Sequence, residues 1–231
     1  MTDRARRVQA TLVGGIALST FRSLPEWDGA CDRLRVLYER HGASAEKAAA
    51  EYAAVYQHQR AAMVFDVVYS ARRNYVTHVK PKVREFLETE GSKSIRALAE
   101  TGTNTVSGRR AQGMRDVAAG LLRFGSDAGV EDDDELCLRW AHQADVGLAY
   151  ELDPYLGNVN GIGLALFHYL RMRCGADTLK PDVRVGTALK DGLGFPLKAG
   201  SSRAVFAMGL GAAAECGIRP IVLDQLLWDS E

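Results

Sequence analysis

The chain has 231 residues, which suits one α-rich domain or two closely apposed lobes with an ample core. Its formal net charge is zero, so the overall charge does not indicate a nucleic-acid partner, and its composition is that of an ordinary soluble protein. No apolar run reaches the roughly 20 residues that a membrane-spanning helix needs, so we expect no membrane association.

The spacing of the cysteines and histidines argues against a bound metal. The four cysteines lie far apart and form no C-x-x-C pair, which favours reduced thiols in a cytosolic setting over a zinc site. These cysteines are Cys31, Cys137, Cys174 and Cys216. The five histidines show no H-x-x-x-H spacing. We therefore expect no metal and no cofactor.

The chain begins with several basic residues and a short apolar run, a combination that is also found at the start of signal peptides. Charged and aromatic residues resume at Phe21-Arg22, and no small-residue cleavage site follows. We therefore expect residues 1–19 to form a helix of the folded domain.

Three helices are predicted between residues 30 and 75. The first ends at Gly42, and the second begins near Ser44 and is rich in alanine, the best intrinsic helix former. The run from Met63 to Tyr75 has enough β-branched residues for a strand. One such run has no evident partner strand, so a helix is the better interpretation.

The middle of the chain is basic although the whole chain is neutral. Between residues 72 and 115, lysine and arginine residues outnumber glutamate residues. A local contact with phosphate requires such a basic patch. The alternative interpretation is that these residues form a solvated helix face. The acidic run 131–135 offsets this charge. We expect this run to be a solvated loop in which Asp134 or a neighbour caps a helix over Leu136–His142.

Residues 94–124 predict a helix, a loop and a second helix. Ser94–Glu100 forms the first helix, Gly102–Gly108 the loop and Arg110–Arg123 the second helix. Four apolar residues of the second helix share one face and should point inward: Met114, Val117, Leu121 and Phe124.

A glycine hairpin between helices is predicted in the stretch 156–185. Asp153-Pro154 is a good helix start, so we expect a short helix up to Val159 and then a tight turn over Asn160–Gly163. Apolar spacing predicts the next helix from Leu164 to about Arg173.

The rest of the chain is also predicted to be helical. A helix begins at Pro181-Asp182 and runs to about Lys190, and two more cover Ser202–Cys216 and Ile221–Trp228. Every predicted element is a helix, so the fold class is all-α.

This order of hairpin, helix and acid resembles the helix-hairpin-helix (HhH-GPD) DNA glycosylase superfamily, in which a hairpin of the form L-x-G-[IV]-G precedes a helix and an aspartate follows. The matching residues are Val159-Asn160-Gly161-Ile162-Gly163 and Lys180-Pro181-Asp182-Val183-Arg184-Val185. Asp182 lies nineteen residues beyond Gly163. The helix, loop and helix at 94–124 similarly precede the hairpin in that family. The close match covers 156–185 and a looser one covers 92–231.

The chain departs from the family pattern at three positions. Asn160 stands where the family often has proline, and Arg184 stands where it often has histidine. Ala165 stands where the bifunctional, lyase-type members have a lysine. The resemblance therefore implies a monofunctional enzyme that hydrolyses the glycosidic bond without forming a Schiff base. The chain also lacks the clustered C-terminal cysteines that hold an iron–sulfur cluster in some members.

The resemblance implies an all-α, two-lobed HhH-GPD glycosylase-like fold that occupies 1–231 as a single domain. One lobe holds the N-terminal helices, 1–90, and the other holds the hairpin region, 92–231. The resemblance further implies that the protein is a monomer and that it lies in the cytoplasm, associated with the nucleoid. Its expected substrate is double-stranded DNA that contains a damaged or modified base.

In such an enzyme the hairpin and nearby basic residues would bind DNA phosphates through backbone N–H groups and cations. These residues are Asn160, Gly161, Ile162, Gly163, Lys180 and Arg184. Asp182 would be catalytic, because an ionised carboxylate beside the sugar stabilises an oxocarbenium-like transition state and orients the attacking water. Its position after a proline also makes Asp182 an ideal helix N-cap, and the two roles are compatible.

The target base would flip out of the stack into a pocket lined by aromatic and polar side chains. The candidates are Tyr69, Trp140, His142 and Tyr150, although aromatic residues at helical spacing are more often core residues. The sequence leaves open whether the base is alkylated, oxidised or a hypermodified phage-type base. Two alternatives also stay open: a non-catalytic helix-hairpin-helix DNA-binding protein, and a helical interaction protein with no DNA role.

Overall fold

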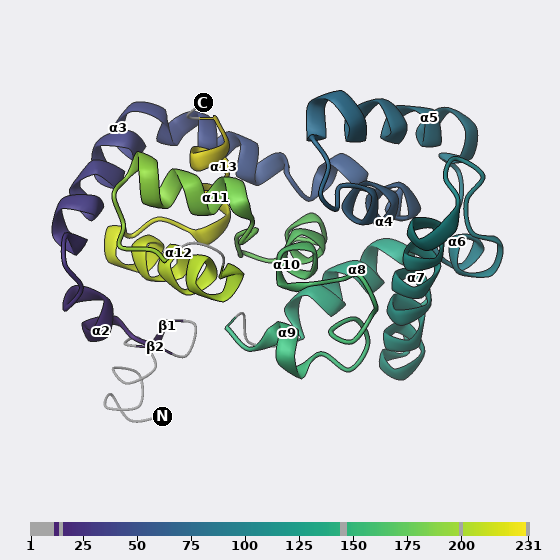
Figure 1. The fold of residues 1–231 in the computed structure, drawn as a ribbon. Helices are drawn as coiled ribbons and strands as arrows, with labels where there is room; N and C mark the ends of the chain where they lie inside the picture. The colour runs from purple at the N-terminus through teal and green to yellow at the C-terminus, as the bar shows by residue number, and fades with distance from the viewer. Residues whose placement is uncertain (1–11, 14–15, 144–146, 199–200, 230–231) are drawn as a thin grey trace. The chain divides into compact units, whose positions relative to one another are not determined.

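A computed structural model describes residues 12–13, 16–143, 147–198 and 201–229, and within them the regular structure is helical except for one pair of two-residue strands (Figure 1). The all-α class is therefore confirmed. The chain divides into two compact units, which we call the terminal unit and the central unit. The terminal unit comprises Met1–Glu51, Asp145–Leu148 and Asp177–Glu231, and the central unit comprises Tyr52–Ala144 and Ala149–Ala176.

This grouping differs from the expected lobes 1–90 and 92–231. The difference arises because the last helices of the chain pack on α3 (Trp27–Glu51), so the two ends of the sequence share one unit. The central unit is the nearly continuous middle of the chain.

The elements of the terminal unit are β1 (Leu12–Val13), β2 (Ile16–Ala17), α2 (Leu18–Arg22), α3 (Trp27–Glu51), α11 (Val183–Thr187), the π-helical turn η3 (Ala188–Gly192), α12 (Ser202–Cys216) and α13 (Pro220–Asp229). Those of the central unit are the 3₁₀ turn η1 (Ala54–Tyr56), α4 (Arg60–Tyr69), the π-helical turn η2 (Tyr75–Val79), α5 (Lys80–Glu90), α6 (Ile95–Thr101), α7 (Gly108–Ala128), α8 (Asp133–His142), α9 (Ala149–Leu152) and α10 (Leu164–Arg173).

The predicted helix over residues 1–19 is wrong in its second half. Leu12 pairs with Ala17 and Val13 pairs with Ile16 in an antiparallel ladder, and the first helix, α2, begins only at Leu18. The β-branched Val13 and Ile16 favour a strand, and the sequence joins the two strands by a pair of glycines. Residues 1–11 and 14–15 lie outside the described part of the chain.

The predicted helix end at Gly42 is also wrong, because α3 continues from Trp27 to Glu51 without a break. Gly42 is buried inside the helix, and a Cβ atom built on it would lie 2.9 Å from ring atoms of Tyr38. The glycine therefore makes room for the tyrosine one turn earlier. The alanine-rich segment that follows supplies the helix propensity that carries α3 past this position.

The terminal unit buries its core between α3 and the late helices. Figure 1 shows α3 beside α12 and α13, and α13 packs along α3 while α12 contacts both. Trp27 is 1% exposed; its ring stacks on that of Phe21 at a centroid distance of 5.4 Å and meets that of Phe195 edge-on at 5.3 Å. Arg33 donates a hydrogen bond of 2.7 Å from Nε to the Leu193 carbonyl, which ties α3 to the segment after η3.

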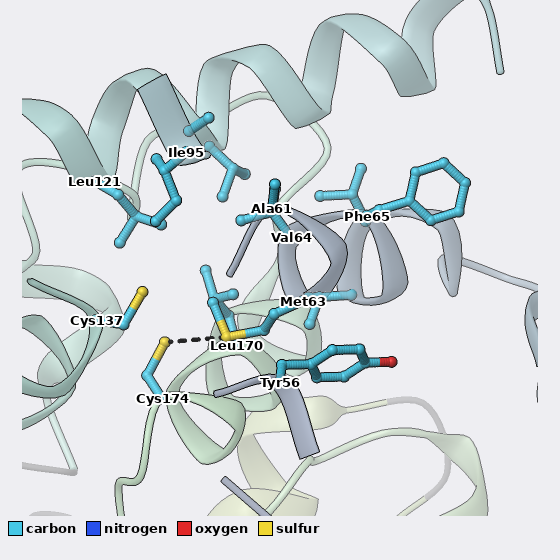
Figure 2. Packing of buried hydrophobic residues seen from close by; sticks show 14 of the residues in the cluster. Tyr56, Ala61, Met63, Val64, Phe65, Ile95, Leu121, Cys137, Leu170 and Cys174 are labelled. Atoms are coloured by element: carbon cyan, nitrogen blue, oxygen red, sulfur yellow. Dashed lines mark hydrogen bonds between the residues drawn. The ribbon is translucent and has the colours of Figure 1, made fainter. Parts of the chain in front are cut away.

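The core of the central unit is organised around α4. All ten residues of α4 are buried, including Arg60 and Asp66, and the helix contacts α5, α7, α8 and α10. Figure 2 shows Met63, Val64 and Phe65 of α4 within this core. A helix that is apolar on every side must be covered on every side. This explains why the β-branched run is a helix, as predicted, and not a strand. The predicted end at Tyr75 is wrong, because α4 ends at Tyr69.

Several predicted helices are confirmed with their caps. Ser94 accepts a hydrogen bond from the Ala97 amide at the start of α6, and the four predicted inward residues of α7 are all buried. Asp132 caps α8 by accepting from the amides of Asp134 and Glu135.

The acidic run is not a solvated loop throughout. Asp133 accepts a hydrogen bond of 2.9 Å from the Ile95 amide at the start of α6. Asp134 pairs with Arg60 at 2.5 Å and accepts from the His58 amide. Asp133 and Asp134 are held in place because each accepts a hydrogen bond from a donor that the fold would otherwise leave without a partner.

Candidate functional site

The hairpin turns at Gly161, whose φ of +86° is a conformation that residues with a side chain rarely adopt. The Ile162 amide donates to the Val159 carbonyl at 3.0 Å, and the Ile162 side chain is 4% exposed. Ile162 thus anchors the turn in the core of the central unit. Gly163 has an extended backbone, with φ −88° and ψ 176°, and is the N-cap residue of α10.

The outer side of the hairpin is open. Asn160, Gly161 and Gly163 are exposed, and a Cβ atom built on either glycine would meet no atom within 4 Å. No side chain caps the first turn of α10. The backbone N–H groups at this helix start therefore face a surface that an anion can reach.

Asp153 holds the base of the hairpin. One carboxylate oxygen accepts from the Tyr155 and Leu156 amides at 2.8 and 2.6 Å, and the other accepts from the Trp140 indole at 2.8 Å. The carboxylate therefore closes a turn in residues 154–158, so the predicted helix from Asp153 to Val159 is wrong although the capping role of Asp153 is right.

Two of the four residues expected in a base pocket support the hairpin instead. Trp140 and Tyr150 both meet the ring of Phe167 edge-on, at centroid distances of 5.6 and 5.4 Å. The Tyr150 hydroxyl donates to the Ile162 carbonyl at 3.3 Å. Trp140 is only 1% exposed, so its indole is a core group and is not available to stack on a base.

The other two expected pocket residues lie elsewhere. Tyr69 is buried and stacks on Phe65 at 5.5 Å, while the guanidinium groups of Arg73 and Arg110 lie 4.5 and 5.9 Å from its ring centroid. His142 is exposed at the end of α8. The four residues therefore do not gather around one cavity. Arg73 and Arg110, which both belong to the predicted basic stretch, thus lie over the same aromatic ring, that of Tyr69.

Asp182 caps α11, as its place after Pro181 predicts. Its Oδ1 accepts from the Val185 amide at 3.1 Å, and its Oδ2 lies 3.2 Å from the Lys180 ammonium. The side chain is 25% exposed, so the carboxylate is reachable from solvent. Sequence reasoning thus placed this residue correctly at a helix start.

Lys180 and Arg184 are both engaged within the terminal unit. The Lys180 amide donates to Asp224 at 2.8 Å while its ammonium faces Asp182. The Arg184 guanidinium lies 3.6 Å from the ring centroid of Trp228 and donates to the Trp228 carbonyl at 2.6 Å. Arg184 thereby ties α11 to α13, a contact that the sequence did not predict.

A cavity of about 280 Å³ opens beside Asp182. Its lining includes Asp182, Thr187, Lys190, Lys198 and Ser201. No aromatic ring is among the described residues that line it. Val183, Leu197 and Val205 supply apolar lining, and the lysines, hydroxyls and carboxylates supply a smaller polar part, so the cavity can contact both faces of a sugar ring.

A buried polar cluster in the central unit escaped the sequence analysis. Asp66 is 0% exposed, and one of its oxygens accepts from the hydroxyls of Tyr56, Tyr75 and Tyr169 at 2.9, 3.3 and 2.9 Å. The Arg173 guanidinium lies 3.6 Å from the same oxygen. Burial and the Asp66 charge raise the pKa of Tyr56 and of Tyr169, so both hydroxyls stay protonated donors.

No signal in the sequence could have identified this cluster. Tyr169 lies 103 residues from Asp66, and the nearer tyrosines follow no motif.

No family model, curated protein or solved structure matches this chain. Within the described residues no group of three or more histidine, cysteine, aspartate or glutamate side chains could hold a metal ion. No single helix of the described chain is long and apolar enough to cross a membrane; one pair, Ser202–Cys216 with Pro220–Trp228, meets the length and composition criteria only as two helices bent by 106°.

Proposed function

We propose that the chain is a monofunctional DNA glycosylase of the helix-hairpin-helix type, which hydrolyses the N-glycosidic bond of a flipped-out damaged or modified base and leaves an abasic site. The observation that carries this proposal is the exposed glycine hairpin at the uncapped start of α10, followed after nineteen residues by the solvent-accessible Asp182. The positive φ of Gly161 would require a glycine in any turn of this shape, whereas Gly163 has an extended backbone that any residue can adopt, so its lack of a side chain on the open surface is what favours a ligand contact.

The hairpin would bind the DNA backbone through its amides. Each contact of a phosphate with a helix start contributes about 0.3–1 kcal/mol at an exposed site. Such contacts hold the DNA in register without reading its sequence. The openness around Gly161 and Gly163 supports this role, because a phosphate must approach the backbone closely.

Asp182 would act on the target sugar. Its ionised carboxylate would stabilise positive charge on the ring as the glycosidic bond breaks, and would orient the attacking water. The cavity beside it would receive the sugar, and Lys190 and Lys198 in its lining would contact an adjoining phosphate. Ala165 offers no amine two residues after Gly163, which favours hydrolysis over a lyase reaction.

A second candidate is a DNA-binding protein without catalysis. One observation favours it: helix capping and the Lys180 ion pair already account for both oxygens of Asp182. The two candidates differ only in base release, so one variant separates them.

Asp182→Asn tests the catalytic assignment. Asparagine can accept the same hydrogen bond from the Val185 amide, so the fold and DNA affinity should persist. We expect base release to fall about 100-fold or more, because the charge that stabilises the transition state is lost. The measurement is mass spectrometry of bases released from a panel of natural, alkylated, oxidised and phage-modified genomic DNAs. Equal release by the variant would reject Asp182 as the catalytic residue, and no release by the wild type from any DNA would favour the second candidate.

Gly163→Ala tests the DNA contact. Gly163 has an ordinary extended φ and open space around it, so alanine should not disturb the fold. Its methyl group would obstruct a phosphate at the start of α10, and we expect the Kd for duplex DNA to rise about 2- to 5-fold. Fluorescence anisotropy across a salt series measures both the affinity and its salt dependence.

Gly29→Ala is the matched control. Gly29 is an exposed glycine within α3, and its added methyl group would lie 3.5 Å from the Arg33 side chain, an ordinary contact. This variant should bind DNA like the wild type. Equal affinity of the Gly163 variant, or binding of the wild type without steep salt dependence, would remove the hairpin from the DNA interface.

A further inference from the structure

The four cysteines, far apart in the sequence, form two close pairs in the structure. In the terminal unit, Cys31 of α3 meets Cys216, the last residue of α12, whose Sγ is hydrogen-bonded to the Cys31 carbonyl. In the central unit, Cys137 of α8 lies beside Cys174, which follows α10 (Figure 2). The two pairs differ in their surroundings.

The Cys31–Cys216 pair lies partly open to solvent. Cys216 is half-buried, and its Sγ donates to the Cys31 carbonyl at 3.7 Å. Contact with Cys31 lowers the pKa of Cys216, against the effect of burial; the Arg35 charge lowers it further, whereas the charges of Glu215 and Asp32 raise it. Cys31 is only 1% exposed. Cys216 is therefore the solvent-accessible thiol of the pair and the one that peroxide can reach.

The Cys137–Cys174 pair lies inside the core. Cys137 is 0% and Cys174 is 1% exposed, and the Cys174 thiol contacts the Met63 sulfur at 3.6 Å (Figure 2). Contact with Cys174, together with burial, raises the pKa of Cys137 well above that of an ordinary thiol. This pair is therefore expected to be inert.

We propose that Cys216 is a site of oxidation by peroxide and that Cys31 is its resolving thiol, so that the terminal unit forms a disulfide between α3 and α12. In the first step the Cys216 thiolate attacks hydrogen peroxide; an S–O bond forms, the O–O bond breaks, and a proton and the departing hydroxide leave as water. In the second step the Cys31 sulfur attacks the sulfenic acid, the S–S bond forms and the S–O bond breaks, and a second water leaves. One peroxide is reduced and two thiols are oxidised.

The order of the two steps follows from the contact between the thiols. While Cys216 is a thiolate, contact with it, together with burial, raises the pKa of Cys31 and keeps that thiol protonated. Oxidation of Cys216 to the sulfenic acid removes the negative charge. Cys31 can then lose its proton and attack the neighbouring sulfur.

Peptide mapping of the peroxide-treated full chain tests the proposal. The folded protein is treated with hydrogen peroxide, its remaining thiols are blocked under denaturing conditions, and the unreduced digest is analysed by mass spectrometry. We expect a Cys31–Cys216 cross-link that forms at least about ten times faster than any Cys137–Cys174 cross-link. The central pair serves as the internal control and needs no mutation. No cross-link, or equal rates for the two pairs, would overturn the proposal.

The variant Cys31→Ser tests the division of roles. Without the resolving thiol, Cys216 should stop at the sulfenic acid and be labelled by dimedone. In Cys216→Ser, Cys31 should neither be labelled by dimedone nor cross-linked. Labelling of Cys31 in place of Cys216 would reverse the assigned roles and contradict the proposal. None of these readouts depends on a reaction with DNA.

Discussion

Asp182 and Asp153 show how a single carboxylate can organise a site. Both oxygens of Asp153 accept hydrogen bonds from buried donors, whereas Asp182 keeps a quarter of its side chain exposed beside a cavity. Both acids follow the preference of aspartate for starting turns and helices. Only the exposed acid has room for a substrate, which is why the proposed chemistry is assigned to Asp182.

His168 makes the stability of the fold dependent on pH. Its side chain is 0% exposed, and burial, with a smaller effect from Arg171, lowers its pKa from 6.5 to about 3. Between these values the unfolded chain binds a proton that the folded chain does not. The free energy of unfolding should therefore fall by about 1.4 kcal/mol for each pH unit as the pH drops below 6.5.

His168→Gln should remove this slope between pH 6.5 and 4.5, the range above the titration of ordinary glutamates. Urea denaturation at several pH values measures it. His41→Gln, at an exposed position of α3, is the control and should keep the wild-type slope. A slope that survives in the His168 variant would show that another group causes the acid sensitivity.

At the scale of elements, one glutamate side chain holds the loop between α6 and α7. The Glu90 side chain is 7% exposed, and its Oε1 accepts from the hydroxyls of Thr103 and Thr105 at 2.6 and 2.8 Å and from the Asn104 backbone amide at 3.0 Å. Its Oε2 pairs with Lys93 at 2.7 Å. Burial acts to raise the pKa of Glu90, but these hydrogen bonds outweigh it and lower the pKa to about 2.

Glu90→Gln should loosen this loop. The glutamine side chain has the same volume but lacks the charge and two of the acceptor positions of the carboxylate. We therefore expect the free energy of unfolding to fall by about 1.5–3 kcal/mol at pH 7. Because the native pKa is depressed, the wild-type advantage should shrink as the pH falls from 4.5 toward 2. Hydrogen exchange of the Asn104 and Thr105 amides should rise in the variant. Unchanged exchange at these amides would contradict the assigned role.

At the scale of the molecule, the Asp66 cluster joins four elements of the central unit. Its tyrosines come from η1, η2 and α10, and Asp66 comes from α4. Asp66→Ala would leave Arg173 without its carboxylate partner, and we expect a loss of about 3–5 kcal/mol. Tyr75→Phe, which removes the longest of the three hydrogen bonds, should cost only about 1 kcal/mol.

Chemical denaturation followed by hydrogen exchange checks this prediction. The Asp66 variant should lose protection in α4 and α10 at a denaturant concentration where α3 and α13 are still protected. Simultaneous loss in both units would show that they unfold as one. A cost below about 1 kcal/mol for Asp66→Ala would mean that the cluster stabilises little.

The sequence predicted those parts of the fold that depend on neighbouring residues. Apolar spacing and a serine cap located α6, and aspartate caps located α8 and α11, because both signals act within one or two turns. The unbroken α3 was missed because Gly42 makes room for Tyr38, a contact that no composition rule contains. The same holds for the candidate site. The turn at Gly161 and the helix cap at Asp182 depend on neighbouring residues and were predicted. The Arg184–Trp228 stack and the Asp66 cluster were missed, because they join residues 44 and 103 positions apart.

The contact between Arg184 and Trp228 also gives the chain an intrinsic optical signal. Trp27 and Trp140 are each 1% exposed, whereas the partly exposed Trp228 indole carries a cation over its face. Any ligand that draws the Arg184 guanidinium away would alter the fluorescence of this one indole and leave the two buried emitters unchanged. The emission spectrum of the unlabelled protein can therefore report on events two residues from Asp182.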